Sequence, residues 1–143
     1  MSKHLVTVAL TVAICFLSSQ VIATDQLLRY DGVYQTPKFK DGVFYFKYLR
    51  FYPDGLVTGV STPGKPEQIQ KWFLPENANI STGKYSVDGN RISFSLKSSA
   101  GVVDFSGELA VDQIRLYSRS KINQNEGEEM YSFLTTKTEQ TAQ

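Results

Sequence analysis

The chain has 143 residues, of which 15 are Lys or Arg and 14 are Asp or Glu. This balance lacks the clustered basic excess of proteins that bind a phosphate backbone, so it argues against a nucleic-acid partner. The one Cys and the one His lie near the N-terminus, at Cys15 and His4, and all later positions lack thiol and imidazole groups.

The N-terminal residues have the three-part pattern of a secretory signal peptide. A basic start at Lys3 precedes an uncharged apolar run at residues 5–17, and small residues end the pattern at Ala23. The run has 13 residues, fewer than the about 20 that span a bilayer, so a cleavable signal over residues 1–23 is preferred to an uncleaved anchor. We therefore predict an exported protein, periplasmic or secreted, without a transmembrane segment in the mature chain.

From Tyr30 onward, short alternating apolar runs are separated by turn residues, which is typical of an all-β sandwich or barrel. Tight turns such as Pro53-Asp54-Gly55 and Asp88-Gly89 leave no room for crossover helices, so neighbouring strands run antiparallel. The pattern predicts a single antiparallel up-and-down barrel over residues 24–136, followed by a disordered tail at 137–143. The eight predicted strands are Tyr30–Thr36, Val43–Tyr52, Leu56–Ser61, Gly83–Val87, Arg91–Ser98, Val102–Ala110, Gln113–Lys121 and Met130–Thr136.

One segment interrupts the meander, between the third and fourth strands. Pro66 suits the first turn of a helix, and Ile69, Trp72 and Phe73 are spaced to form one apolar stripe. This spacing predicts a helix of about two turns.

Several strands start with a glycine followed by an aromatic residue, as in Gly32-Val33-Tyr34, Gly42-Val43-Phe44 and Gly83-Lys84-Tyr85. With the paired hairpins through Leu109, these starts resemble the small lipocalin-like barrels of secreted and periplasmic bacterial proteins. The resemblance extends over residues 30–136. It implies a barrel whose interior holds one small apolar ligand or is just filled by side chains.

The residue types left after signal removal argue against an enzyme. Without His or Cys, histidine bases, thiol nucleophiles and the usual zinc sites are excluded, and we expect no metal and no cofactor. The acidic residues of the turns are expected to accept local backbone N–H bonds. They are Asp41, Asp54, Asp88, Asp112 and Glu126.

The strand at residues 43–52 carries aromatic side chains on both faces, so something must cover its second face. The predicted helix is one candidate cover, and a partner protein or a second copy is another. The third is a ligand pocket lined by Phe44, Phe46 and Tyr48, with Trp72 of the helix. In that pocket Arg50, which lies on the same face of the strand, pairs with an anionic head group. The alternative is that Arg50 lies at the barrel mouth, where it is solvated or paired with an acid.

Two non-catalytic functions follow, and the sequence leaves both open. The first is an exported protein that holds a small apolar or amphipathic ligand in a lipocalin-like barrel. The second is an interaction or inhibitor module of the cell envelope that uses the aromatic strand or the loop at residues 62–75. A filled barrel with an aromatic patch outside would favour the second.

Overall fold

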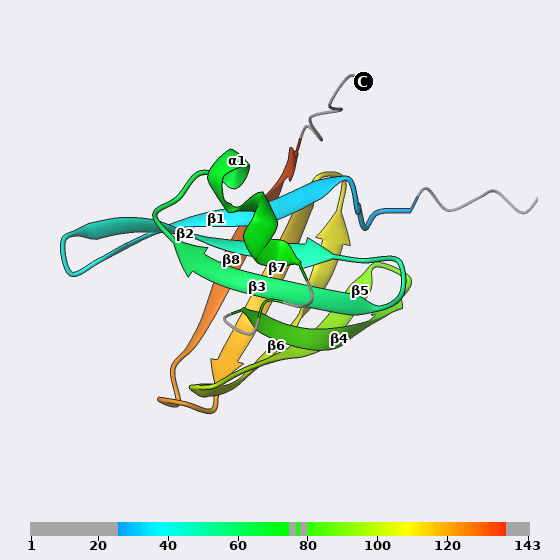
Figure 1. The fold of residues 1–143 in the computed structure, drawn as a ribbon. Coiled ribbons are helices and arrows are strands. Elements are labelled where there is room, and N and C mark those ends of the chain that lie inside the picture. Colours follow the sequence, from blue (N-terminus) through cyan, green and yellow to red (C-terminus); the bar gives the residue numbers. More distant parts are fainter. Residues whose placement is uncertain (1–25, 75–76, 78–79, 137–143) are drawn as a thin grey trace, which may run out of the picture.

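The structure is a computed structural model that describes residues 26–74, 77 and 80–136. It is a closed barrel of eight antiparallel strands, in which each strand pairs with the next in the chain and β1 pairs with β8 (Figure 1). The predicted up-and-down barrel is therefore confirmed, as is the short helix between the third and fourth strands. The predicted signal peptide, residues 1–23, and the predicted tail, residues 137–143, lie outside the described residues.

All eight predicted strands are present, and the largest differences are at β1, which continues to Lys40, and at β8, which begins at Glu126. The extension of β8 is polar and contains Gly127, and the extension of β1 contains Pro37 and a single large apolar residue, Phe39, so neither shows an alternation of apolar residues. The strands are β1 (Gly32–Lys40), β2 (Val43–Phe51), β3 (Leu56–Thr62), β4 (Ser81–Asp88), β5 (Arg91–Ser98), β6 (Gly101–Ala110), β7 (Gln113–Ser120) and β8 (Glu126–Thr135).

Two glycines of the predicted strand starts, Gly32 at the start of β1 and Gly83 within β4, have a clear structural cause. A Cβ added at Gly32 would lie 2.0 Å from the carbonyl oxygen of Leu134, and one at Gly83 would lie 1.9 Å from the carbonyl oxygen of Ser95. Only glycine therefore lets β1 approach β8, and β4 approach β5, this closely. The close approaches fit the strong curvature of a small closed barrel.

Aromatic side chains fill the barrel interior near the end where the chain enters. The rings of Tyr34 and Phe133 have centroids 5.0 Å apart, Tyr34 and Phe51 5.7 Å, and Phe51 and Phe94 5.5 Å, all edge to face. Phe94 stacks on Phe105 at 4.8 Å. Because these rings come from five different strands, they cross the interior from wall to wall. At this level the barrel is a packed core.

The residues before β1 close this end of the barrel. Leu28 is buried in the core cluster. The Arg29 guanidinium donates to the carboxylates of Asp31 and Asp112 and lies 4.0 Å from the centre of the Phe133 ring. Asp112 lies in the turn between β6 and β7, so Arg29 ties the entering segment to that turn.

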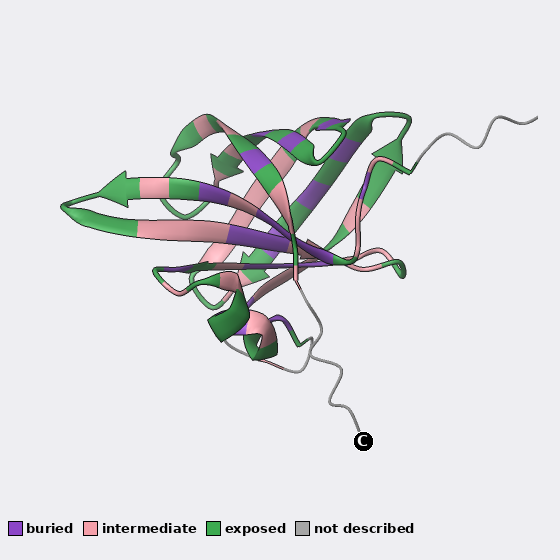
Figure 2. Ribbon diagram, turned by 90° about the horizontal axis from the view of Figure 1, so that it is seen from above, coloured by how far each residue is buried: buried purple, intermediate pink, exposed green. Residues whose placement is uncertain are grey.

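At the other end, which we call the mouth, β1 and β2 continue beyond the closed part of the barrel. Among the described residues, the β1–β8 ladder joins only Gly32–Gln35 to Ser132–Thr135, whereas the β1–β2 ladder continues to the pair of Lys40 and Val43. We call the projecting hairpin, residues 36–47, the arm. It extends to the left in Figure 1, and Figure 2 shows burial giving way to exposure toward its end.

Candidate functional site

The two faces of β2 belong to different apolar clusters. Leu49 and Phe51 belong to the barrel core. Tyr48 belongs to a second cluster, against which Phe46 packs. Since successive side chains of a strand point to opposite faces, Leu49 and Phe51 point inward and the even-numbered residues of β2 point outward.

This arrangement corrects the orientation assumed for the predicted ligand pocket. The side chains of Phe44, Phe46, Tyr48 and Arg50 share the outer face of β2 and do not line the barrel interior. Aromatic residues on both faces of the strand left its orientation undetermined in the sequence. Its register with β1, which pairs Leu49 with the core residue Tyr34, determines which face is inward.

A short helical segment covers the outer face of β2 near the barrel. It consists of α1 (Pro66–Ile69) and the 3₁₀ turn η1 (Gln70–Phe73). Ile69 and Phe73 are each 1% exposed and pack in the second cluster with Tyr48, whose hydroxyl donates to the carbonyl of Gly64 at 2.8 Å. The helix therefore accounts for this part of the aromatic strand.

Trp72 is the member of the predicted apolar stripe that does not dock. Its side chain is 44% exposed, whereas those of Ile69 and Phe73 are buried. The face of α1 and η1 that packs on β2 is narrow. It presents only Ile69 and Phe73, which are four residues apart. Trp72 is therefore not among the residues of the second cluster, which contains Tyr48 and against which Phe46 packs.

Arg50 lies under this cover in a half-buried position. Its guanidinium is 5.3 Å from the centre of the Tyr52 ring, and the Tyr52 hydroxyl donates to the carbonyl of Phe73. Among the described residues, no hydrogen-bond partner reaches Arg50 Nε or the buried hydroxyl of its cross-strand neighbour Thr58. The cation therefore packs against an aromatic ring on the outer face of the wall.

Three charged side chains that the sequence analysis did not select meet inside the mouth. Lys47 Nζ lies 3.0 and 3.2 Å from the two carboxylate oxygens of Glu129, and Lys38 Nζ contacts the first of them. The Tyr131 hydroxyl donates to the second oxygen at 3.1 Å. The Glu129 side chain is 10% exposed, whereas those of Lys38 and Lys47 are 34% and 32% exposed.

The charges in the mouth do not cancel. Burial acts to raise the pKa of Glu129, but the hydrogen bonds from Lys38 and Lys47 outweigh it and hold the pKa below the ordinary value. The carboxylate is thus ionised near neutral pH. Two ammonium groups facing one carboxylate leave the mouth with a net positive charge. Lys47 lies two residues before Leu49 and so points to the same, inward face of β2. The sequence could have indicated this position only if the orientation of β2 had been known.

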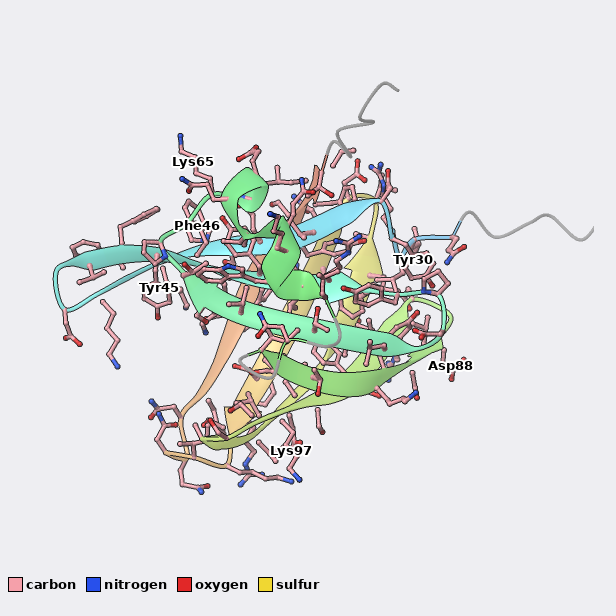
Figure 3. The ribbon with its side chains drawn as sticks, viewed as in Figure 1. Tyr30, Tyr45, Phe46, Lys65, Asp88 and Lys97 are labelled. Atoms are coloured by element: carbon pink, nitrogen blue, oxygen red, sulfur yellow. The ribbon has the colours of Figure 1, made fainter. Side chains whose placement is uncertain are left out.

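The end of the arm exposes three large apolar side chains, which we call the arm tip. Phe39 is 72% exposed, Val43 57% and Phe44 53%. The ring of Phe44 meets that of Phe46 edge to face at 5.1 Å, so the aromatic row of β2 continues from the helix contact to the tip. Figure 3 shows Tyr45 and Phe46 on the arm, far from Tyr30 and Asp88 at the opposite end. The helix does not account for this part of the aromatic strand.

A mostly apolar groove of about 800 Å³ lies at the end opposite the mouth. The entering segment forms one side with Leu27, Leu28 and Tyr30, and Tyr85 and Leu109 contribute from β4 and β6. The hydroxyls of Tyr30 and Tyr85 lie 3.1 Å apart, and Tyr85 also donates to the carbonyl of Tyr52. These bonds pair the hydroxyls of the two tyrosines that line the groove.

The turn carboxylates differ in what they contact. Asp54 accepts the backbone N–H of Leu56 at 3.1 Å, as expected of a turn residue. Asp112 instead pairs with Arg29, and Glu126 lies in β8, where it pairs with Arg119. In the described ranges, no three His, Cys, Asp or Glu side chains are grouped to hold a metal ion.

No helix in the described part of the chain is long and apolar enough to cross a membrane. Comparisons with family models, with curated proteins and with solved structures each found no match. The resemblance to lipocalin-like proteins therefore stays a prediction, and the barrel itself is what the structure establishes.

Proposed function

We propose that this protein is an exported, non-catalytic binding module that engages its partner through the arm rather than through a hollow barrel interior. The observation that carries the proposal is the arm tip, where Phe39, Val43 and Phe44 are each more than half exposed on a hairpin that projects beyond the barrel. Clustered exposed apolar side chains mark interaction sites, whereas single ones are normal on protein surfaces.

The packed interior also supports an outside site. The rings of Tyr34, Phe51 and Phe94 fill the barrel interior near the end where the chain enters. The projecting arm is therefore a better candidate for the binding site than the interior. A site on the arm agrees with the interaction or inhibitor module that the sequence left open as the second function.

The chemistry of the described residues supports a role without catalysis. Inside the mouth, the Glu129 carboxylate pairs with Lys38 and Lys47 and accepts a hydrogen bond from the Tyr131 hydroxyl. An ion-paired carboxylate with a lowered pKa is a poor general acid or base at neutral pH.

A photo-crosslinking amino acid placed at Phe44 tests the proposal in the protein's own host. We expect covalent adducts from position 44, and none from the same group at Val111, an exposed residue of the β6–β7 turn at the opposite end of the barrel. Adducts from Val111 alone, or from neither position, would contradict the proposal.

A second candidate function is the binding of a small apolar molecule, and the groove at the opposite end favours it. Val87 lies on its wall and is 43% exposed, so Val87→Asp places a charge in the groove at little cost to the fold. This candidate predicts that the wild-type protein binds a fluorescent hydrophobic probe and that Val87→Asp does not. Equal binding by both proteins would exclude the groove.

A further inference from the structure

We propose that the partner of the arm tip is the surface of a phospholipid bilayer that contains anionic lipids. This inference rests on the proposed function, because it names the partner of the same arm. It combines the shape of the tip, the position of its lysines and the protection of its strand edge.

The tip is apolar on both faces of the hairpin. Phe39 and Phe44 are direct cross-strand partners and share one face, whereas Val43 pairs with Lys40 and lies on the other. A flat protein interface covers one face of a hairpin and leaves the other in water. A bilayer surrounds an inserted tip on all sides, so it buries all three apolar side chains together.

One lysine of the arm lies at its tip, and two lie behind the apolar side chains. Lys40 pairs with Val43 in the last pair before the turn, whereas Lys38 and Lys47 lie nearer the barrel, on the inward face. With a rise of about 3.3 Å for each strand residue, Lys47 lies roughly 10 Å behind Phe44. If the tip lies at the boundary between headgroups and acyl chains, Lys47 is therefore at the level of the headgroups.

The arm carries more basic than acidic side chains. The arm contains Lys38, Lys40 and Lys47 against Asp41 alone, and counting Glu129, which pairs with two of these lysines, leaves a net charge of +1. Each lysine near an anionic leaflet adds attraction. Charge complementarity therefore favours anionic over zwitterionic lipids.

The edge of the arm is poorly suited to the addition of a partner strand. Pro37 has no backbone N–H, and the charged side chain of Lys38 points inward beside it. Both features protect an edge strand against pairing with another chain. Recognition by the side chains of the tip is thus more consistent with the structure than strand addition by a peptide.

Vesicle co-sedimentation tests the inference with protein purified after export from a secreting host, its N-terminus determined so that all variants share it. The vesicles contain phosphatidylcholine alone or mixed with phosphatidylglycerol. We expect binding to the mixed vesicles that falls about tenfold in Phe39→Ser and about tenfold in Phe44→Ser, because each substitution removes an exposed aromatic side chain that the bilayer buries on binding. Val111→Ser, an equally exposed apolar position away from the arm, should bind as the wild type does.

The charge contribution has its own pair of variants. Lys40→Gln should weaken binding to the mixed vesicles about fivefold and leave binding to phosphatidylcholine unchanged. Lys84→Gln, an exposed lysine of β4, should change neither. Equal thermal unfolding of all variants excludes misfolding as the cause.

The outcomes separate the two proposals. Absent vesicle binding, or binding that the tip variants do not change, overturns the lipid inference. If position 44 nevertheless crosslinks to a protein in the host, the proposed interaction function stands with a different partner. Equal binding to both kinds of vesicle overturns the preference for anionic lipids.

Discussion

Lys47 of β2 and Glu129 of β8 form an ion pair, with Nζ and Oε1 3.0 Å apart, although β1 lies between their strands in the sheet. The pair spans the place where β1 and β8 separate, beyond the last residues of their ladder. Lys38 of β1 contacts the same carboxylate. Side chains thus hold the mouth together where backbone pairing has ended.

Glu129→Gln should destabilise the barrel by about 2 kcal/mol, because it leaves two partly buried ammonium groups without their carboxylate. Glu128→Gln is the matched control, since Glu128 points outward with its side chain 66% exposed and lies 3.9 Å from Arg115. Urea unfolding measures both free energies. A Glu129→Gln protein as stable as Glu128→Gln would show that the ion pairs do not stabilise the mouth.

The same carboxylate predicts a pH dependence. The pKa of Glu129 is lowered from its ordinary value of about 4.5, so the unfolded chain binds a proton more readily than the folded one. The stabilisation is therefore present above about pH 4.5 and is lost as the pH falls through the lower folded value. Unfolding free energies measured from pH 7 to pH 3 should fall more steeply for the wild type than for Glu129→Gln. Parallel curves would contradict this assignment.

Most of the fold could be predicted because it depends on local patterns. Alternation in the strand at Arg91–Ser98 and the tight turn at Asp88-Gly89 indicate an antiparallel meander without long-range information. The cover on the outer face of β2 was also open to prediction, since Ile69 and Phe73 require a partner surface.

The candidate site was less accessible, because it depends on pairing between distant strands. The inward face of β2 is set by its register with β1, and its own sequence is apolar on both faces. Glu129 lies in a polar stretch that carries no strand signal, and its contacts with Lys38 and Lys47 appear only when the barrel closes. The exposure of Phe39 likewise depends on where the β1–β8 ladder ends.

Phe73 and Trp72 are adjacent aromatic residues for which the structure predicts losses of stability of different size. Phe73→Ala should cost about 3 kcal/mol, because it opens a cavity in the second cluster and loosens the helix from β2. Trp72→Ala should cost less than about 1 kcal/mol, since its side chain is 44% exposed. Chemical denaturation compares them. A larger loss for Trp72→Ala would mean that η1 docks through its other side.

Thr58 offers a substitution that should stabilise the protein. Its side chain is fully buried on the outer face of β3, and no described residue offers its hydroxyl a hydrogen-bond partner. Thr58→Val keeps the shape and removes the unpaired hydroxyl, so we expect a gain of about 1 kcal/mol in the free energy of unfolding. Thr135→Val, at an exposed position of β8, should have little effect. A loss of stability in Thr58→Val would show that the hydroxyl is hydrogen-bonded in solution, and that the space under α1 and η1 holds the partner, which Arg50 Nε would then share.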